Sequence, residues 1–105
     1  MKLVVAIVHE QDATRAIEVL GGRGFGVTRL KSEGGFLQRR NSLLLLGVDD
    51  NLVEEVISTL RSVCKPRHEQ LGNGRSDSAT GESEVEVEVG RATVFVLELG
   101  RVERL

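Results

Sequence analysis

The sequence predicts an α+β domain made of two similar halves, each an apolar strand followed by a helix and a further strand. Leu3–Val8 is a continuous apolar run rich in β-branched residues, which is typical of a buried strand. Apolar residues recur at helical spacing in residues 13–20 and 53–64. Glu84–Val89 alternates with a period of two, as expected for a strand with one polar face. The resulting order, βαββαβ with an extra C-terminal hairpin strand, is that of a ferredoxin-like fold.

In the first half, the apolar strand leads into a helix that Asp12 is suited to cap. The apolar residues of this helix fall on one face: Ala13, Ala16, Ile17 and Leu20. Glycines at positions 21, 22 and 24 end the helix. A second strand is expected over Phe25–Ser32, with Phe25 and Val27 facing the core and Leu30 as a further candidate.

The second half repeats this pattern. Ser42–Val48 is expected to form the third strand, and Asp50 is suited to cap the second helix. Pro66 ends this helix, whose apolar face contains Val53, Val56, Ile57, Leu60 and Cys64. Both helices can therefore cover one face of the sheet. The strands carry enough apolar residues for the other face to pack against further subunits.

A long polar segment, Lys65–Ser83, separates the second helix from the last strands. It is rich in Gly, Ser, Asn, Asp and Arg and cannot offset its ordering entropy by burial, so residues 65–83 are expected to form a long flexible loop. A functional loop and a solvated linker without a role both remain open. Beyond it, Glu84–Val89 and Ala92–Leu99 are expected to pair as a hairpin through a two-residue turn at Gly90-Arg91.

Composition limits the class of protein. A chain of 105 residues fits a single domain, 1–105, and a domain of this size favours a homo-oligomer. The net charge of −2 argues against a nucleic-acid-binding protein. The apolar runs are too short for a signal peptide or a membrane span, so no membrane insertion is expected. The single cysteine, Cys64, fits a reducing compartment, and we expect a cytoplasmic protein.

The chain shows no catalytic pattern. His9 and His68 lie far apart, without a cysteine at metal-ligand spacing, so no metal site is expected. The corner His9–Asp12 fits a helix start better than an acid–base pair, and Cys64 fits a buried thiol. We therefore expect a binding protein that is not an enzyme and needs no cofactor.

Residues 33–41 form the best candidate binding site in the sequence. Gly34 and Gly35 allow a ligand to approach the backbone closely and expose N–H groups to an anion. Phe36 offers a ring face on which a base can stack. Together these features indicate a site for a nucleotide or another phosphorylated small molecule.

Five segments together match a known family. They are residues 1–8 with Gln11-Asp12, Phe25-x-Val-Thr28, Gly34-Gly-Phe-Leu37 with Asn41, Gly47-Val-x-Asp50, and Val85–Leu97. In these segments the chain resembles the PII-like cyclic-di-AMP receptor family, a branch of the PII signal-transduction superfamily. The resemblance implies a cytoplasmic bacterial signal-transduction receptor that forms a homotrimer with its sheets facing inward. One cyclic-di-AMP molecule would then bind at each subunit boundary.

The resemblance also implies which residues contact the ligand: Thr28, Gly34, Gly35, Phe36, Leu37, Asn41 and Gly47. Glycine N–H groups and the Thr28 hydroxyl suit phosphate oxygens, and Asn41 can pair with a base edge. Arg29, Arg39 and Arg40 are candidates for the countercharge. The loop Glu33–Arg40 would close over the ligand, and the long loop would respond and signal to an unknown downstream protein. Phe95 could line the pocket, but we expect it in the core.

Three features of the sequence depart from the family pattern. Gly26 stands where a basic residue is common, Arg39-Arg40 replaces a small glycine-containing turn, and Leu43 replaces a polar residue. A second hypothesis therefore stays open: a PII-like trimeric scaffold or regulator that has lost the ability to bind cyclic-di-AMP or binds another nucleotide. Convergence of the three arginines on the cleft would favour the receptor. ATP is less favoured because the loop after the second strand lacks the long tyrosine-bearing form of PII proteins.

Overall fold

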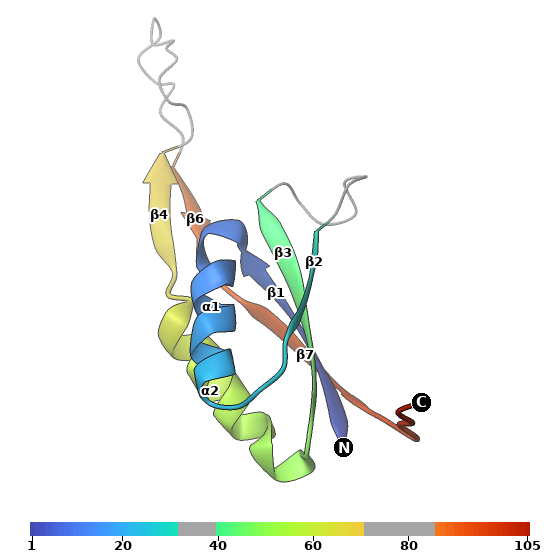
Figure 1. Ribbon diagram of the computed structural model, residues 1–105. Coiled ribbons are helices and arrows are strands. Elements are labelled where there is room, and N and C mark those ends of the chain that lie inside the picture. The colour runs from blue at the N-terminus through green and yellow to red at the C-terminus, as the bar shows by residue number, and fades with distance from the viewer. Residues whose placement is uncertain (32–39, 71–85) are drawn as a thin grey trace, which may run out of the picture.

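The computed structural model describes residues 1–31, 40–70 and 86–105. Its main sheet contains β1 (Lys2–His9), β2 (Thr28–Lys31), β3 (Asn41–Val48) and β7 (Thr93–Glu98). These strands are antiparallel to their neighbours in the order β2-β3-β1-β7. The helices α1 (Glu10–Gly22) and α2 (Val53–Val63), the latter preceded by the short turn η1 (Asp50–Leu52), cover one face (Figure 1). This arrangement confirms the predicted ferredoxin-like α+β fold.

The core lies between this sheet and the two helices. Alternate residues of β1 and β3 are buried against the helices, including Val4, Ala6, Leu44 and Leu46. The predicted helix faces are confirmed, because Ala13, Ala16, Leu20, Val53, Val56, Leu60 and Cys64 are buried, while Ile17 and Ile57 pack partly buried against them. The strand residues that recur every two positions and the helix residues that recur every 3.6 positions therefore pack together in one apolar layer.

Both predicted helix caps are wrong. The N-cap of α1 is His9, whose Nδ1 accepts a hydrogen bond from the Gln11 N–H at 3.2 Å, and Asp12 lies in the first turn. Because β1 runs directly into α1, the last strand residue occupies the cap position. At the second helix, η1 comes first, and Asp49 occupies its N-cap position without a capping hydrogen bond from its side chain. The Asp50 carboxylate instead binds the N-terminal ammonium group at 2.8 Å.

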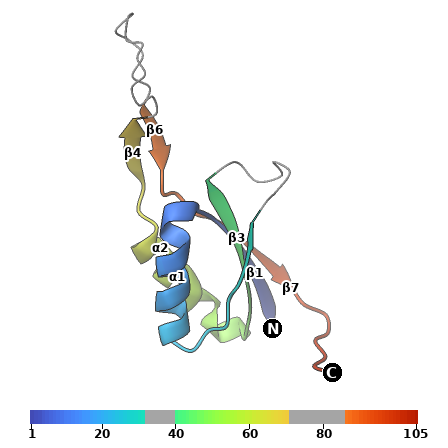
Figure 2. The ribbon, with the colours of Figure 1, turned by 45° about the horizontal axis from the view of Figure 1, so that its top comes forward.

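The predicted hairpin between the last two strands is also wrong. β6 (Glu86–Val89) pairs with β4 (Arg67–Gln70) in a separate two-stranded sheet, the β4–β6 ribbon, whereas β7 pairs with β1. Gly90, at φ +93°, lies where the chain leaves the ribbon for the main sheet. The predicted long loop 65–83 thus begins with a strand, while residues 71–83 lie outside the described part. Figure 2 shows the ribbon extending beyond the main sheet.

Replacing Gly90 with alanine should lower the free energy of unfolding by about 1–3 kcal/mol, because a positive φ disfavours a side chain. The added Cβ would also collide with the Lys65 carbonyl oxygen and lie 2.6 Å from Nη1 of Arg67. Gly22→Ala is the matched control, since its Cβ meets nothing within 4 Å. Urea denaturation checks this prediction, and equal stability of the two variants would contradict it.

Candidate functional site

The face of the main sheet that the helices leave uncovered, the open face, is largely apolar. The strand register places Val5 beside both Leu45 and Phe95, so these three side chains share this face. Leu30, Phe95 and Leu97 are 47%, 51% and 47% exposed. The expectation that Phe95 belongs to the core is therefore wrong for the single chain. An apolar surface of this kind is typical of a binding or assembly surface.

Three predicted ligand residues lie on this open face. Thr28 pairs with Leu45, Asn41 pairs with His9, and Gly47 pairs with Leu3. Asn41 and Gly47 are at opposite ends of β3, about 20 Å apart at the usual rise of a strand. A single chain thus brings these residues to one face without bringing them to one point.

The arginines predicted to neutralise the phosphates do not share the position of these three residues. Arg29 lies on the helix side of β2, where its guanidinium group donates to the hydroxyl oxygens of Ser42 and Thr14 at 3.3 Å. Arg40 precedes β3 with φ +77°, and its carbonyl accepts a hydrogen bond from the Glu10 N–H. Gly34, Gly35, Phe36, Leu37 and Arg39 lie outside the described residues. Of the three arginines, Arg29 therefore does not lie on the open face, and the described residues do not show the predicted convergence.

His9 is a residue whose position sequence reasoning missed, because we expected only a helix start there. Its side chain is 5% exposed, and Nε2 is buried without a hydrogen-bond partner among the described residues. Since Nδ1 accepts the capping hydrogen bond, Nε2 carries the proton of the neutral ring. This buried nitrogen, for which the described part of the chain supplies no acceptor, lies next to Asn41 in the strand register.

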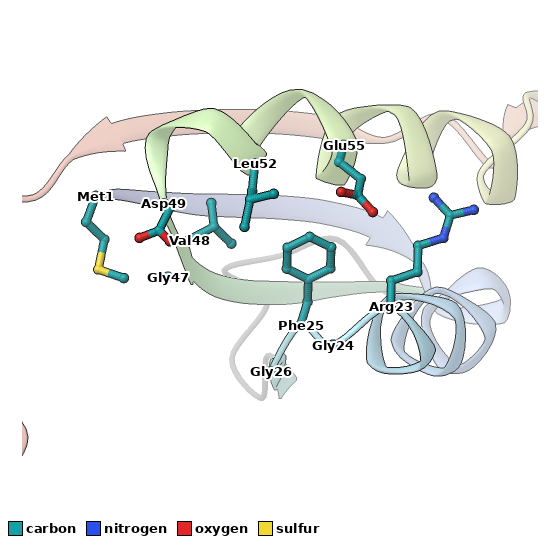
Figure 3. Close-up of a pocket in the computed structure, with 10 residues that line it drawn as sticks. All are labelled: Met1, Arg23, Gly24, Phe25, Gly26, Gly47, Val48, Asp49, Leu52 and Glu55. Atoms are coloured by element: carbon teal, nitrogen blue, oxygen red, sulfur yellow. The ribbon is translucent and has the colours of Figure 1, made fainter.

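A pocket of about 240 Å³ opens at the other end of β3 (Figure 3). The Phe25 ring points into it between Leu52 and the backbone at Gly26. A Cβ added to Gly26 or Gly47 would meet no atom within 4 Å, so both glycines leave the pocket open. The remaining lining residues are Met1, Arg23, Gly24, Val48, Asp49 and Glu55.

Three cations at this end of the molecule, Arg23, Lys2 and the N-terminal ammonium group, already have partners within the protein. The Arg23 guanidinium donates to the Thr59 hydroxyl at 2.6 Å, which ties the end of α1 to α2. The hydrogen bond from the N-terminal ammonium lowers the pKa of Asp50, although desolvation opposes this shift. The hydrogen bond from Lys2 to Glu98 raises the pKa of Lys2. The cations at this end are therefore held by protein groups.

A second pocket, of about 410 Å³, lies between α2 and the start of β7. It is lined mainly by apolar side chains and by two arginines: Ile57, Leu60, Arg61, Cys64, Pro66, Arg91, Ala92 and Val94. The Cys64 thiol on its wall is 4% exposed. Burial, with a smaller contribution from the Asp12 carboxylate, raises the pKa of Cys64 to about 11.

The raised pKa of Cys64 predicts a loss of stability at alkaline pH. The folded protein favours the neutral thiol of Cys64. The stability that this preference contributes is fully present when the pH is below about 9, the usual pKa of a thiol. It should be lost as pH rises from 9 to about 11, by up to about 2 kcal/mol. Urea denaturation of the natural protein and of Cys64→Ala across this range checks the prediction. Parallel pH profiles would contradict it.

Neither metal clusters nor membrane-spanning helices are found in the described ranges. Among residues 1–31, 40–70 and 86–105, no three His, Cys, Asp or Glu side chains are grouped to hold a metal ion. Within the same ranges, no helix combines the length and apolar character needed to cross a membrane.

Comparison with known proteins gives two findings. The family model described as cyclic-di-AMP receptor matches residues 1–105, the whole chain. The chain is also similar to a solved structure, that of a functionally unknown protein from Pediococcus pentosaceus ATCC 25745. That similarity has a TM-score of 0.74 and 31% sequence identity, over 99% of this chain and 96% of the other. With the predicted fold and the whole sequence matching, this chain belongs to the cyclic-di-AMP receptor family.

Proposed function

We propose that this protein is a bacterial cytoplasmic receptor that binds cyclic-di-AMP at the subunit boundaries of a homotrimer. The observation that carries the proposal is the position of Thr28, Asn41 and Gly47 on one open, apolar sheet face. Membership of the cyclic-di-AMP receptor family supports this ligand and a role in signalling without catalysis. Ligand binding would be relayed to a downstream protein through the segments that flank the site.

The geometry of the open face supports a site between subunits. Asn41 and Gly47 are too far apart in one chain to hold the same phosphate or base. When the open faces of three copies meet, the end of β3 in one copy can approach a different strand end in the next. The same contact would remove the half-exposed Leu30, Phe95 and Leu97 from water, which favours assembly.

The chemistry of the described residues fits a cyclic dinucleotide. The bare backbone at Gly47 lets a ligand approach closely. The Thr28 hydroxyl can donate to a phosphate oxygen, and the Asn41 amide can both donate to and accept from a base edge. Stacking on Phe36 and contacts from Gly34, Gly35 and Leu37 remain predictions from the sequence.

Arg29 is bound on the helix side, whereas Arg39 and Arg40 remain the countercharge predicted from the sequence for the two phosphates. Gly26 leaves room for a further cation in the pocket near Gly47. Gly26→Arg should therefore tighten cyclic-di-AMP binding by about fivefold to thirtyfold, through a charge-assisted hydrogen bond. Gly21→Arg, on an exposed helix end, is the matched control. Equal affinities of both variants would contradict the prediction.

The alternative is a trimeric scaffold or regulator that has lost the ability to bind cyclic-di-AMP or binds another nucleotide. It is favoured by the absence of a side chain at Gly26 and by the engagement of Arg29 and Arg23 with hydroxyl groups of the protein. In that case the open face would still assemble, but the cleft would lack the charge to hold a dianionic ligand.

Calorimetric titration of the purified protein distinguishes the two. The receptor predicts saturable binding of cyclic-di-AMP near one molecule per subunit, with weaker or no binding of ATP and cyclic-di-GMP. Asn41→Ala should weaken binding by about tenfold to a hundredfold, because a base edge loses its partner. An assembled protein that gives neither heat nor thermal stabilisation with cyclic-di-AMP would establish the scaffold instead.

A further inference from the structure

The β4–β6 ribbon needs an attachment to the rest of the molecule. It forms a sheet of its own and shares no strand pairing with the main sheet. Two strands alone are at best marginally stable in water. Figures 1 and 2 both show the ribbon extending past the N-terminal end of α1. The contacts at this point therefore decide where the ribbon lies.

Arg67, the first residue of β4, makes these contacts. Its Nη1 lies 3.3 Å from Oδ2 of Asp12, and its Nη2 donates to Oε1 of Gln11 at 3.2 Å. The side chain of Asp12 is only 13% exposed and that of Arg67 36%, so water screens this ion pair less than a surface pair. The planar guanidinium group presents two separate nitrogens to the two acceptors in a fixed geometry, whereas a lysine has only one nitrogen to offer both.

The same guanidinium group lies at the base of the ribbon, where the chain enters it and leaves it. Nη1 of Arg67 donates to the Lys65 carbonyl at 3.3 Å. Gly90, which follows β6, packs so closely against that carbonyl and against Nη1 that only a glycine fits. The segment that enters the ribbon at Lys65 and the segment that leaves it at Gly90 thus both lie next to the Arg67 guanidinium group.

The helix end held by Arg67 also contacts the residue before β3. The Glu10 N–H donates to the Arg40 carbonyl, next to Asn41. We propose that Arg67, with Gln11 and Asp12, is a latch that fixes the β4–β6 ribbon to the N-terminal end of α1. The latch joins the base of the ribbon to the end of the open face that carries Asn41, so a change at one is transmitted to the other. Transmission from the latch to the ligand site rests on the proposed function, whereas the existence of the latch does not.

The chain contains its own reporter of this latch. Cys64 is the single cysteine, is 4% exposed and precedes Arg67 by three residues. Opening of the latch should expose its thiol, so the rate of modification by a small thiol reagent measures opening. The two latch charges act on the thiol in opposite directions, because Asp12 raises its pKa and Arg67 lowers it.

The experiment compares thiol-modification rates of the full chain and five variants at one pH. Arg67→Gln and Asp12→Asn should each accelerate modification about threefold to thirtyfold, and the double variant should be no faster than the faster single one. The controls are Arg61→Gln, three residues before Cys64, and Glu10→Gln, in the same helix turn as Asp12. Both controls should leave the rate within about twofold.

The outcomes separate a latch from other roles. A purely electrostatic effect on the thiol would slow modification in Arg67→Gln and accelerate it in Asp12→Asn, which would overturn the proposal. Control variants as fast as the latch variants would overturn it as well. If Arg67→Gln does not fold, Arg67→Lys replaces it, since it keeps the charge but loses the two-acceptor geometry, and it should still accelerate modification.

Cyclic-di-AMP provides the second arm of the experiment. In the natural protein, saturating ligand should change the modification rate at least threefold, and in Arg67→Gln it should not. A bound ligand that changes both rates equally would overturn transmission through the latch. Absence of binding by calorimetry would instead count against the proposed function, and the ligand-free comparison would still decide whether the latch exists.

Discussion

Gly47→Val should abolish measurable cyclic-di-AMP binding while leaving the chain folded. Gly47 is exposed on the open face at the end of β3, and a Cβ there meets no atom of the same chain within 4 Å. Valine is also well suited to a strand, so the subunit should keep its stability. The new side chain would occupy the space through which a ligand approaches the backbone.

The expected loss in affinity for Gly47→Val is at least a hundredfold, because the ligand must either clash with the side chain or leave its polar groups unpaired. Calorimetry measures the affinity, and circular dichroism confirms the fold. Gly22→Val is not a suitable control because a β-branched residue weakens a helix, so Gly22→Ala is used instead. Unchanged affinity of Gly47→Val would place the ligand elsewhere.

Phe95→Asp should convert the assembled protein into monomers. Phe95 is 51% exposed in the single chain and lies midway along the edge strand β7, where it shares the open face with its neighbour Val5. A carboxylate at this position is solvated in the monomer but must lose water in an assembly. The penalty of about 3 kcal/mol or more per contact would raise the dissociation constant by over a hundredfold.

Analytical ultracentrifugation measures this change. Val102→Asp is the matched control, because Val102 is 55% exposed but follows β7 and lies outside the sheet. The control should sediment like the natural protein. A Phe95→Asp protein that remains assembled would show that the open face is not the subunit interface.

The sequence revealed those parts of the fold that depend on local periodicity. The faces of α1 and α2 were predictable because residues such as Ala16 and Leu60 recur at helical spacing and are buried. The strand β4 was not, because Arg67–Gln70 is polar and becomes a strand only through pairing with β6, far along the chain. A local turn rule at Gly90-Arg91 likewise suggested a hairpin, whereas long-range pairing with β1 determined the position of β7.

The candidate site was predictable to a similar extent. The position of Asn41 and Gly47 on one face follows from the even spacing of residues in a strand, although the resemblance to a family selected them. The direction of Arg29 was not predictable, because it depends on hydroxyl partners from α1 and β3. The burial of His9 could not be predicted either, because its side chain caps α1 only as a result of β1 running directly into that helix.

Native mass spectrometry of the protein with cyclic-di-AMP tests the central claim most directly, since it reports subunits and ligands together. A site shared between subunits predicts a trimer that carries up to three molecules of cyclic-di-AMP, and monomers that carry none. Monomers that bind the ligand on their own, or trimers that never bind it, would contradict a site shared between subunits.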